Sequence, residues 1–252
     1  MHAYLAEFVG TALLVLFGNG VVANVVLSRT KGSGGGWIVI AAGWGIAVFI
    51  GAFCSQQFSG AHLNPAVSVA MLIAEKLSWV DSLGYIASQM AGAMFGAAMV
   101  FVYYREHFKV TDNADDKLAC FCTSPNIRQI KQALICEVIG TYVLILPIFL
   151  MVAPSIQLSE SASDLPALGL GTLGLLPVGL LVFGIGLSLG GTTGYAINPA
   201  RDLGPRLIHS LLPLRGKRDS DWGYAWVPVV GPLIGAALAA LTYRLLIDPV
   251  PI

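Results

Sequence analysis

Charged side chains are scarce in this chain, because Asp, Glu, Lys and Arg make up only 11% of its 252 residues. A soluble globular domain carries about 25% charged residues. Hydrophobic residues reach 56%, and the net charge is zero. A protein that binds nucleic acid shows a basic surface, so we exclude nucleic acid as a partner. The composition instead predicts a chain that is surrounded by a lipid bilayer.

Residues with catalytic or metal-binding spacing are also lacking. The four cysteines, at positions 54, 120, 122 and 136, have no metal-ligand spacing. Cys120 and Cys122 lie in a polar stretch and are interpreted as free thiols without a role. No nucleophile–base pair or phosphate-binding loop occurs, so we expect no cofactor, no metal and no enzymatic activity. The first apolar segment lacks the features of a removable signal, which predicts that it is retained as a membrane span.

Long apolar stretches are abundant. A membrane-spanning helix needs about 20 predominantly apolar residues. Two other apolar stretches are only about half as long, and each follows a short loop rich in Gly, Ser and Thr. Short, interrupted segments at matching places in two halves indicate a permeation site. The expected spans are Tyr4–Leu27, Trp37–Gln57, Val80–Tyr104, Gln129–Val152, Gly171–Leu189 and Tyr224–Leu246, and the half-length segments are Pro65–Glu75 and Pro199–Leu212.

The two halves of the chain repeat each other. Three signatures recur in the same order: AEFVGT as CEVIGT, SGAHLNPA as TGYAINPA, and GAMFG as GPLIG. We expect one channel domain over residues 1–252, with repeats at about 1–104 and 129–252 joined by a loop at 105–128. Each repeat has three spans, an odd number, so the second must enter the membrane from the opposite side. This predicts an all-α membrane protein with six transmembrane helices, two re-entrant half-helices and inverted repeats.

The motif Asn-Pro-Ala opens both half-length segments, as Asn64, Pro65 and Ala66 and again as Asn198, Pro199 and Ala200. Asn is a favoured N-cap and Pro is favoured at the first helical position. If each Asn oxygen caps its own helix, each NH₂ group remains as a donor. Half-helices that enter from opposite faces then direct both donors, and both positive helix ends, at one point near the membrane midplane.

These residues resemble the aquaporin superfamily over nearly the whole chain. The resemblance is carried by the duplicated NPA motifs in SGAHLNPAVS and TGYAINPARDLGP. The Asp that follows the arginine in NPARD, Asp202, resembles the sequence pattern of the glycerol-facilitator (aquaglyceroporin) branch. The resemblance implies one pore in each subunit, a homotetramer, a multi-pass location in the cell membrane and cytoplasmic N- and C-termini.

The resemblance also implies a narrow selectivity filter formed by Trp44, Gly186, Tyr195 and Arg201. Trp44 and Tyr195 would face the carbon backbone of glycerol, while Arg201 would donate hydrogen bonds to its hydroxyl groups. Gly186 would leave room where strict water channels have a bulky His. Tyr195 departs from the Phe that is usual in facilitators and adds a hydroxyl. Taken alone, the two aromatic residues would more often be packing or interfacial residues, and Arg201 an interfacial arginine.

Other polar residues in or near apolar segments allow either a functional or a structural interpretation. Glu7 and Glu137 match positions that brace the entry loops in this family, although either could lie in the headgroup zone. His62 is expected to pack the first loop rather than to sense pH. Asp202 is expected to be a structural partner of nearby backbone or of a cation. The G-x-x-x-G pairs at Gly92–Gly96 and Gly231–Gly235 are expected to form contacts between the third and sixth helices.

The expected function is passive conduction of glycerol, other small neutral solutes and water, with exclusion of ions and protons. The alternative is an ion-coupled secondary transporter, which would need several ionisable residues within the membrane. A membrane enzyme, sensor or scaffold has little support. The sequence does not rank glycerol against urea, dihydroxyacetone, hydrogen peroxide or lactic acid. Lys and Arg gather in the loops that the family orientation places outside the cell, opposite to the usual cytoplasmic excess.

Overall fold

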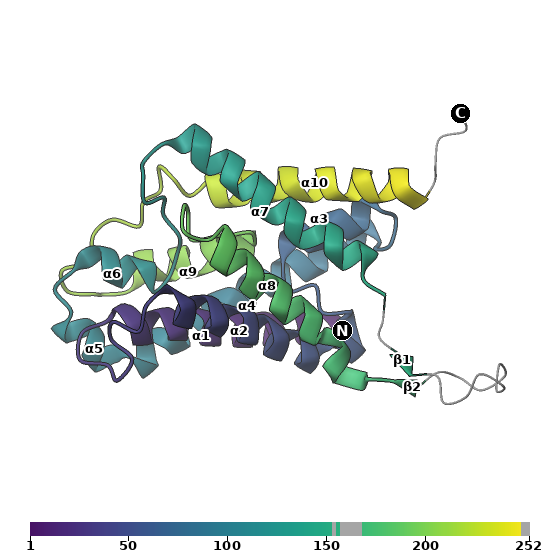
Figure 1. Cartoon of the computed structure of the whole chain (residues 1–252). Helices are drawn as coiled ribbons and strands as arrows, with labels where there is room; N and C mark the ends of the chain where they lie inside the picture. Colours follow the sequence, from purple (N-terminus) through teal and green to yellow (C-terminus); the bar gives the residue numbers. More distant parts are fainter. Residues whose placement is uncertain (153–154, 157–167, 248–252) are drawn as a thin grey trace.

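The computed structural model describes residues 1–152, 155–156 and 168–247. Within these residues six helical segments are long and apolar enough to cross a membrane. They lie side by side as a bundle (Figure 1). The segments are α1 (His2–Val26), α2 (Trp37–Ser59), α4 (Trp79–Tyr103), α7 (Ile130–Leu150), η1 (Gly171–Leu175) continued by α8 (Leu176–Ser188), and α10 (Val227–Ile247). The six expected spans are therefore confirmed, with ends that differ by a few residues.

Two shorter helices, α3 (Pro65–Ile73) and α9 (Pro199–Leu211), are the expected half-helices. Their 9 and 13 residues correspond to about 14 and 20 Å at a rise of 1.5 Å per residue, less than the roughly 30 Å of the hydrocarbon core. In Figure 1, α3 lies toward the end of the bundle where the C-terminal end of α10 lies, and α9 lies toward the opposite end, near α5 and α6. The predicted fold class is confirmed.

The segment that joins the two repeats is more ordered than the loop expected at 105–128. It contains α5 (Arg105–Val110) and α6 (Ala114–Ala119). Asn113 starts α6, since its side-chain oxygen accepts from the Asp115 N–H at 2.9 Å. Phe108 and Phe121 pack with ring centroids 5.6 Å apart, and both are buried. The segment folds because its few apolar residues join the main hydrophobic core of the bundle, which the polar residues around them do not reveal.

Two further details correct the sequence interpretation. Cys120 and Cys122 are buried beside Phe121, so they do not lie in an exposed polar loop, although both are free thiols as expected. A two-residue antiparallel pairing, β1 (Ser155–Ile156) with β2 (Leu168–Gly169), lies between α7 and η1. Its small size leaves the fold class unchanged.

The G-x-x-x-G pairs do not join the third span to the sixth. A Cβ added to Gly92 of α4 would lie 2.3 Å from the Phe8 carbonyl oxygen in α1. A Cβ added to Gly96 would lie 2.5 Å from the Ala12 carbonyl oxygen, also in α1. A Cβ on Gly235 of α10 would lie 2.4 Å from the Val138 carbonyl oxygen in α7. Each pair therefore brings the last span of a repeat against its first span. The expectation was wrong because the G-x-x-x-G spacing indicates that a helix packs closely against another helix but does not identify which one.

The outward faces of the long helices are apolar. Such a continuous apolar surface would be unusual on a soluble monomer but is suited to lipid contact. Together with the six spans, it makes the chain a multi-pass membrane protein. Examples of exposed side chains are Leu5, Ile46, Phe53, Leu180, Leu238 and Leu245.

Candidate conducting pore

Both half-helices begin with the cap that the motif predicts. The Asn64 Oδ1 accepts from the Ala66 N–H at 2.9 Å. The Asn198 Oδ1 accepts from the N–H groups of Ala200 and Arg201 at 3.0 and 3.2 Å. Pro65 and Pro199 occupy the first helical positions. Each Asn oxygen is thus committed to its own helix, which turns the NH₂ group away from it.

The two Asn side chains reach across to the opposite loop. The Asn64 Nδ2 donates to the Ile197 carbonyl oxygen at 2.9 Å, and the Asn198 Nδ2 donates to the Leu63 carbonyl oxygen at 2.8 Å. This reciprocal pair joins the starts of two helices that lie toward opposite ends of the bundle. One N–H of each amide is used in this way. The second N–H has no protein acceptor among the residues that the structure describes, and it can donate to a molecule in the pore.

The loops that lead into α3 and α9, here called the entry loops (residues 60–63 and 194–197), have strained backbone. Two buried carboxylates hold them in place. Ala61, Leu63, Tyr195 and Ile197 have φ angles between 37° and 56°. Left-handed backbone at non-glycine residues costs of the order of 1–2 kcal/mol each, so it needs support. The backbone of these loops bonds to side chains instead of forming a regular ladder, since the carbonyl oxygens of Leu63 and Ile197 accept from the two Asn side chains.

Glu7 supplies that support in the first repeat. Its Oε1 accepts from the His62 N–H at 2.9 Å and its Oε2 from the Leu63 N–H at 2.7 Å. The Ser59 hydroxyl and the Gln89 amide donate to the same carboxylate at 2.6 and 2.7 Å. Gln89 was absent from the sequence-based site, although a Gln in the middle of an apolar span could have pointed to it.

Glu137 occupies the equivalent place in the second repeat. Its Oε1 and Oε2 accept from the N–H groups of Ala196 and Ile197 at 3.0 and 2.8 Å. Glu7 and Glu137 are both fully buried within the protein, so neither carboxylate lies on the surface of the bundle. His62 packs on the Tyr85 ring at 5.0 Å, and its Nδ1 lies 3.1 Å from the Ser68 hydroxyl.

A cavity of about 300 Å³ lies where the loops meet. Asn64 and Asn198 line it together with Trp44, Tyr195 and Arg201. Other parts of its wall are aliphatic, from Leu14, Val48, Val67, Leu144, Ile148 and Val182. The cavity thus combines an apolar wall with a small number of polar groups.

Three of the four proposed filter residues, Trp44, Tyr195 and Arg201, line the cavity, and Gly186 lies against Tyr195. The Arg201 guanidinium carbon lies 4.0 Å from the centre of the Trp44 ring, and its Nη2 donates to the Gly194 carbonyl oxygen at 3.5 Å. A Cβ added to Gly186 would lie 2.9 Å from the Tyr195 hydroxyl oxygen. Gly186 therefore makes room for this phenol, as well as leaving out a bulky side chain. The Trp44 Nε1 and the Tyr195 hydroxyl are buried and have no hydrogen-bond partner among the described residues.

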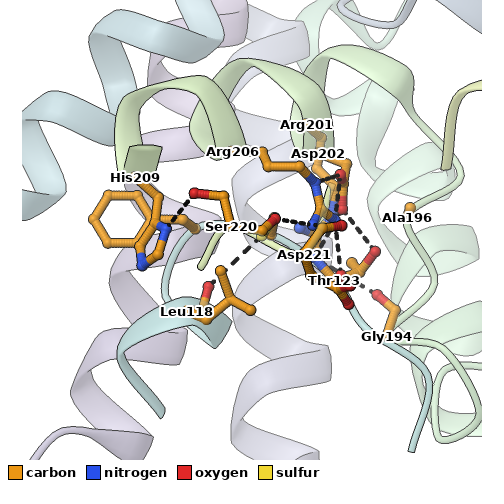
Figure 2. Close-up of polar contacts among 12 residues, drawn as sticks. Leu118, Thr123, Gly194, Ala196, Arg201, Asp202, Arg206, His209, Ser220 and Asp221 are labelled. Carbon is orange, nitrogen blue, oxygen red and sulfur yellow. Dashed lines mark hydrogen bonds and ion pairs between the residues drawn. The ribbon is translucent and has the colours of Figure 1, made fainter. Parts of the chain in front are cut away.

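A buried polar network beside the filter was mostly missed from the sequence. Asp202 accepts from the Thr123 N–H and hydroxyl, both at 2.7 Å, and from the Arg206 Nε at 2.8 Å (Figure 2). Arg206, which is fully buried, also donates to the carbonyl oxygens of Ser220 and Asp221 at 2.7 and 3.2 Å. Asp202 is thus a structural partner of nearby backbone, as expected. The i, i+4 spacing of Asp202 and Arg206 was the available signal.

Known proteins are similar to this chain over nearly its whole length. A glycerol uptake facilitator protein from Streptococcus pneumoniae (strain ATCC BAA-255 / R6) is 51% identical over 97% of this chain and 99% of its own length. A probable glycerol uptake facilitator protein from Thermotoga maritima is also 51% identical, with the same coverage. The X-ray structure of the aquaglyceroporin from Plasmodium falciparum superposes with a TM-score of 0.81 at 32% identity, covering 98% of this chain and 97% of that one.

The sequence profile described as major intrinsic protein matches residues 1–243. With the six spans, the two half-helices and the relatives above, this match shows that the chain belongs to the major intrinsic protein family.

Proposed function

We propose that this chain is a passive channel that conducts glycerol, other small uncharged solutes and water across the cell membrane. The observation that carries the proposal is the reciprocal pair of hydrogen bonds between Asn64 and Ile197 and between Asn198 and Leu63. It places two amide donors at the junction of the half-helices, beside a cavity with one aliphatic wall. The relatives named glycerol uptake facilitators support the choice of solute.

The filter suits a molecule with hydroxyl groups on one side and carbon on the other. Arg201 donates to the hydroxyl oxygens, while the Trp44 and Tyr195 rings contact the carbon atoms. Deeper in the pore, Asn64 and Asn198 each offer an N–H to the next oxygen. A polyol can therefore exchange hydrogen bonds to water for hydrogen bonds to the channel without carrying charge.

Ions and protons are excluded in this proposal. The N-terminal ends of α3 and α9 carry partial positive charge, and both are directed at the junction. The Arg201 guanidinium adds a full positive charge nearby. A cation entering this narrow space loses hydration and meets repulsion, whereas a neutral solute loses little. The Asn donors also orient a water molecule with its oxygen toward them, which interrupts a continuous proton-conducting chain.

We further propose a homotetramer with a pore in each subunit and cytoplasmic N- and C-termini. Family resemblance supports both features. The transporter alternative finds no specific support, because the two ionisable residues deepest in the spans, Glu7 and Glu137, are both bonded to loop N–H groups.

Stopped-flow light scattering on vesicles that contain the purified protein tests the proposal. Rapid, non-saturating glycerol flux down its gradient is expected, with water flux above that of protein-free vesicles. Urea is measured in the same preparation as a second neutral solute. Rapid water flux without glycerol flux would overturn the assignment to glycerol, and uphill, ion-dependent uptake would favour the transporter.

A further inference from the structure

Trp37 contacts two filter residues without lining the cavity itself. It is the first residue of α2 and is 40% exposed. Its indole Nε1 donates to the Gly186 carbonyl oxygen at 2.8 Å. The edge of its ring lies against the Tyr195 ring, with centroids 5.9 Å apart and an angle of 75° between the planes. A residue that was not part of the sequence-based site therefore joins α2 to α8 and to the second entry loop.

The contact between Trp37 and Tyr195 leaves no spare room. A Cβ added to Gly190 would lie 2.5 Å from the Tyr195 Cδ1 and 2.7 Å from the Trp37 Cζ2. Four residues earlier in the chain, a Cβ on Gly186 would lie 3.0 Å from the Tyr195 Cζ. The phenol is thus enclosed by Trp37 and by two positions that accept only glycine.

Packing alone decides where the Tyr195 ring lies. Its backbone is held with φ at 37°, next to the residues that Glu137 binds. Its hydroxyl, however, has no hydrogen-bond partner within the described part of the chain. A ring without a polar anchor keeps its rotamer only while its neighbours fill the space around it. Trp37 is one such neighbour, with its ring edge against the phenol.

We propose that Trp37 is a positioning residue for Tyr195, and that it sets the width of the filter and so its discrimination among polyols of different size. The inference rests on the proposed conduction of glycerol. Removing the indole leaves a space beside the phenol that the surrounding structure fills only in part. Tyr195 then tilts away from Arg201 and the opening between them grows. A larger solute gains more from this change than glycerol does.

The test compares the glycerol-to-erythritol permeability ratio of wild type and Trp37→Ala in vesicles, by stopped-flow light scattering. Erythritol has one more hydroxylated carbon than glycerol. The ratio is expected to fall by about two- to tenfold, the range that an aromatic pair contributes to a barrier. A purely structural role for Trp37 would lower the number of open channels and reduce both fluxes alike, leaving the ratio unchanged. An unchanged ratio overturns the inference.

Two further variants show whether Trp37 acts through Tyr195. In a Tyr195→Ala background, Trp37→Ala is expected to leave the ratio nearly constant, because the residue that it positions is missing. An equal fall in both backgrounds would overturn the inference. Trp37→Phe keeps a ring edge and removes the bond to Gly186, so it should retain most of the discrimination, and it serves as the folded substitute if Trp37→Ala is unstable.

The matched control is Trp226→Ala, which removes a similarly exposed tryptophan just before α10 and should leave the ratio at its wild-type value. The wild-type measurement separates the two proposals. Absence of glycerol flux in wild type would contradict the proposed function, whereas wild-type glycerol flux with no effect of Trp37→Ala contradicts only the role of Trp37.

Discussion

Arg201 is a single residue whose charge and bulk both act on the pore. It lies over the Trp44 ring and is 7% exposed. We expect Arg201→Ala to widen the filter and to remove a positive charge from it, so that potassium and proton leak rise while glycerol still passes. Vesicles with a potassium gradient and an enclosed pH dye measure both leaks. Arg215→Ala removes an exposed arginine and serves as the control. Selectivity that stays at the wild-type value would contradict a filter role for Arg201.

Glu137 allows a second prediction at this scale, because it holds two backbone N–H groups with its two oxygens. A Gln at this position has one oxygen, so either the Ala196 or the Ile197 N–H loses its acceptor. An unsatisfied buried donor costs about 1–3 kcal/mol. We expect Glu137→Gln to lower the thermal midpoint in detergent and to reduce glycerol flux. Glu106→Gln is the control, because it makes the same change at an exposed ion pair that contributes little to stability. It should leave the thermal midpoint and the glycerol flux unaltered.

Contact between whole helices depends on glycines that face backbone. Gly96 of α4 lies so near α1 that a Cβ would sit 2.5 Å from the Ala12 carbonyl oxygen, whereas a Cβ on Gly184 of α8 would meet nothing within 4 Å. We therefore expect Gly96→Ala to separate the two helices and to lower the thermal midpoint. Gly184→Ala should be neutral, or stabilising by up to about 1 kcal/mol through helix propensity. Thermal unfolding of both variants in the same detergent compares them, and equal midpoints would contradict the close packing.

The loop before α10 is tied to the linker by an ion pair outside the spans. Arg128 donates to both oxygens of Asp221 at 2.6 Å and holds the pKa of that carboxyl below its usual value. The stabilisation is fully present above the unfolded pKa of about 3.9, and it is lost as the pH falls through the lower folded pKa. We expect the thermal midpoint of wild type to exceed that of Asp221→Asn at pH 7, with the difference shrinking toward pH 3.

A control on the same linker isolates that pair. Asp112 is exposed, so Asp112→Asn should follow the wild-type curve across the whole pH range. A constant gap between wild type and Asp221→Asn from pH 7 to pH 3 would show that the carboxylate contributes through something other than its ionised form.

For the whole molecule, the features that could be predicted from the sequence are those that follow from its internal repeats and its hydrophobic pattern. Span length and the two NPA motifs predicted six spans and two half-helices, since these depend on local composition. Residue pairing was harder. Gln89 and Trp37 act through partners 82 and 149 residues away in the chain, and Arg206 bonds Thr123 at a separation of 83 residues as well as the nearby Asp202. Neither spacing nor hydropathy identifies such distant partners. The two short helices of the linker went unpredicted for a related reason, because Phe108 and Phe121 pack together only after folding brings them close.

The direction of the chain in the membrane is the last property of the whole molecule to test. Most Lys and Arg residues lie in the linker, the loop between α1 and α2 and the loop before α10, at the end away from both termini. The usual excess of Lys and Arg in cytoplasmic loops would place that end in the cytoplasm, whereas family resemblance places it outside the cell. We expect the family orientation, because the match to the duplicated NPA motifs is far more specific than a count of charges. A membrane-impermeant thiol reagent should then label Lys31→Cys in intact cells and Lys76→Cys only after permeabilisation, with wild type as the blank. The reverse labelling pattern would show that the positive charge prevails.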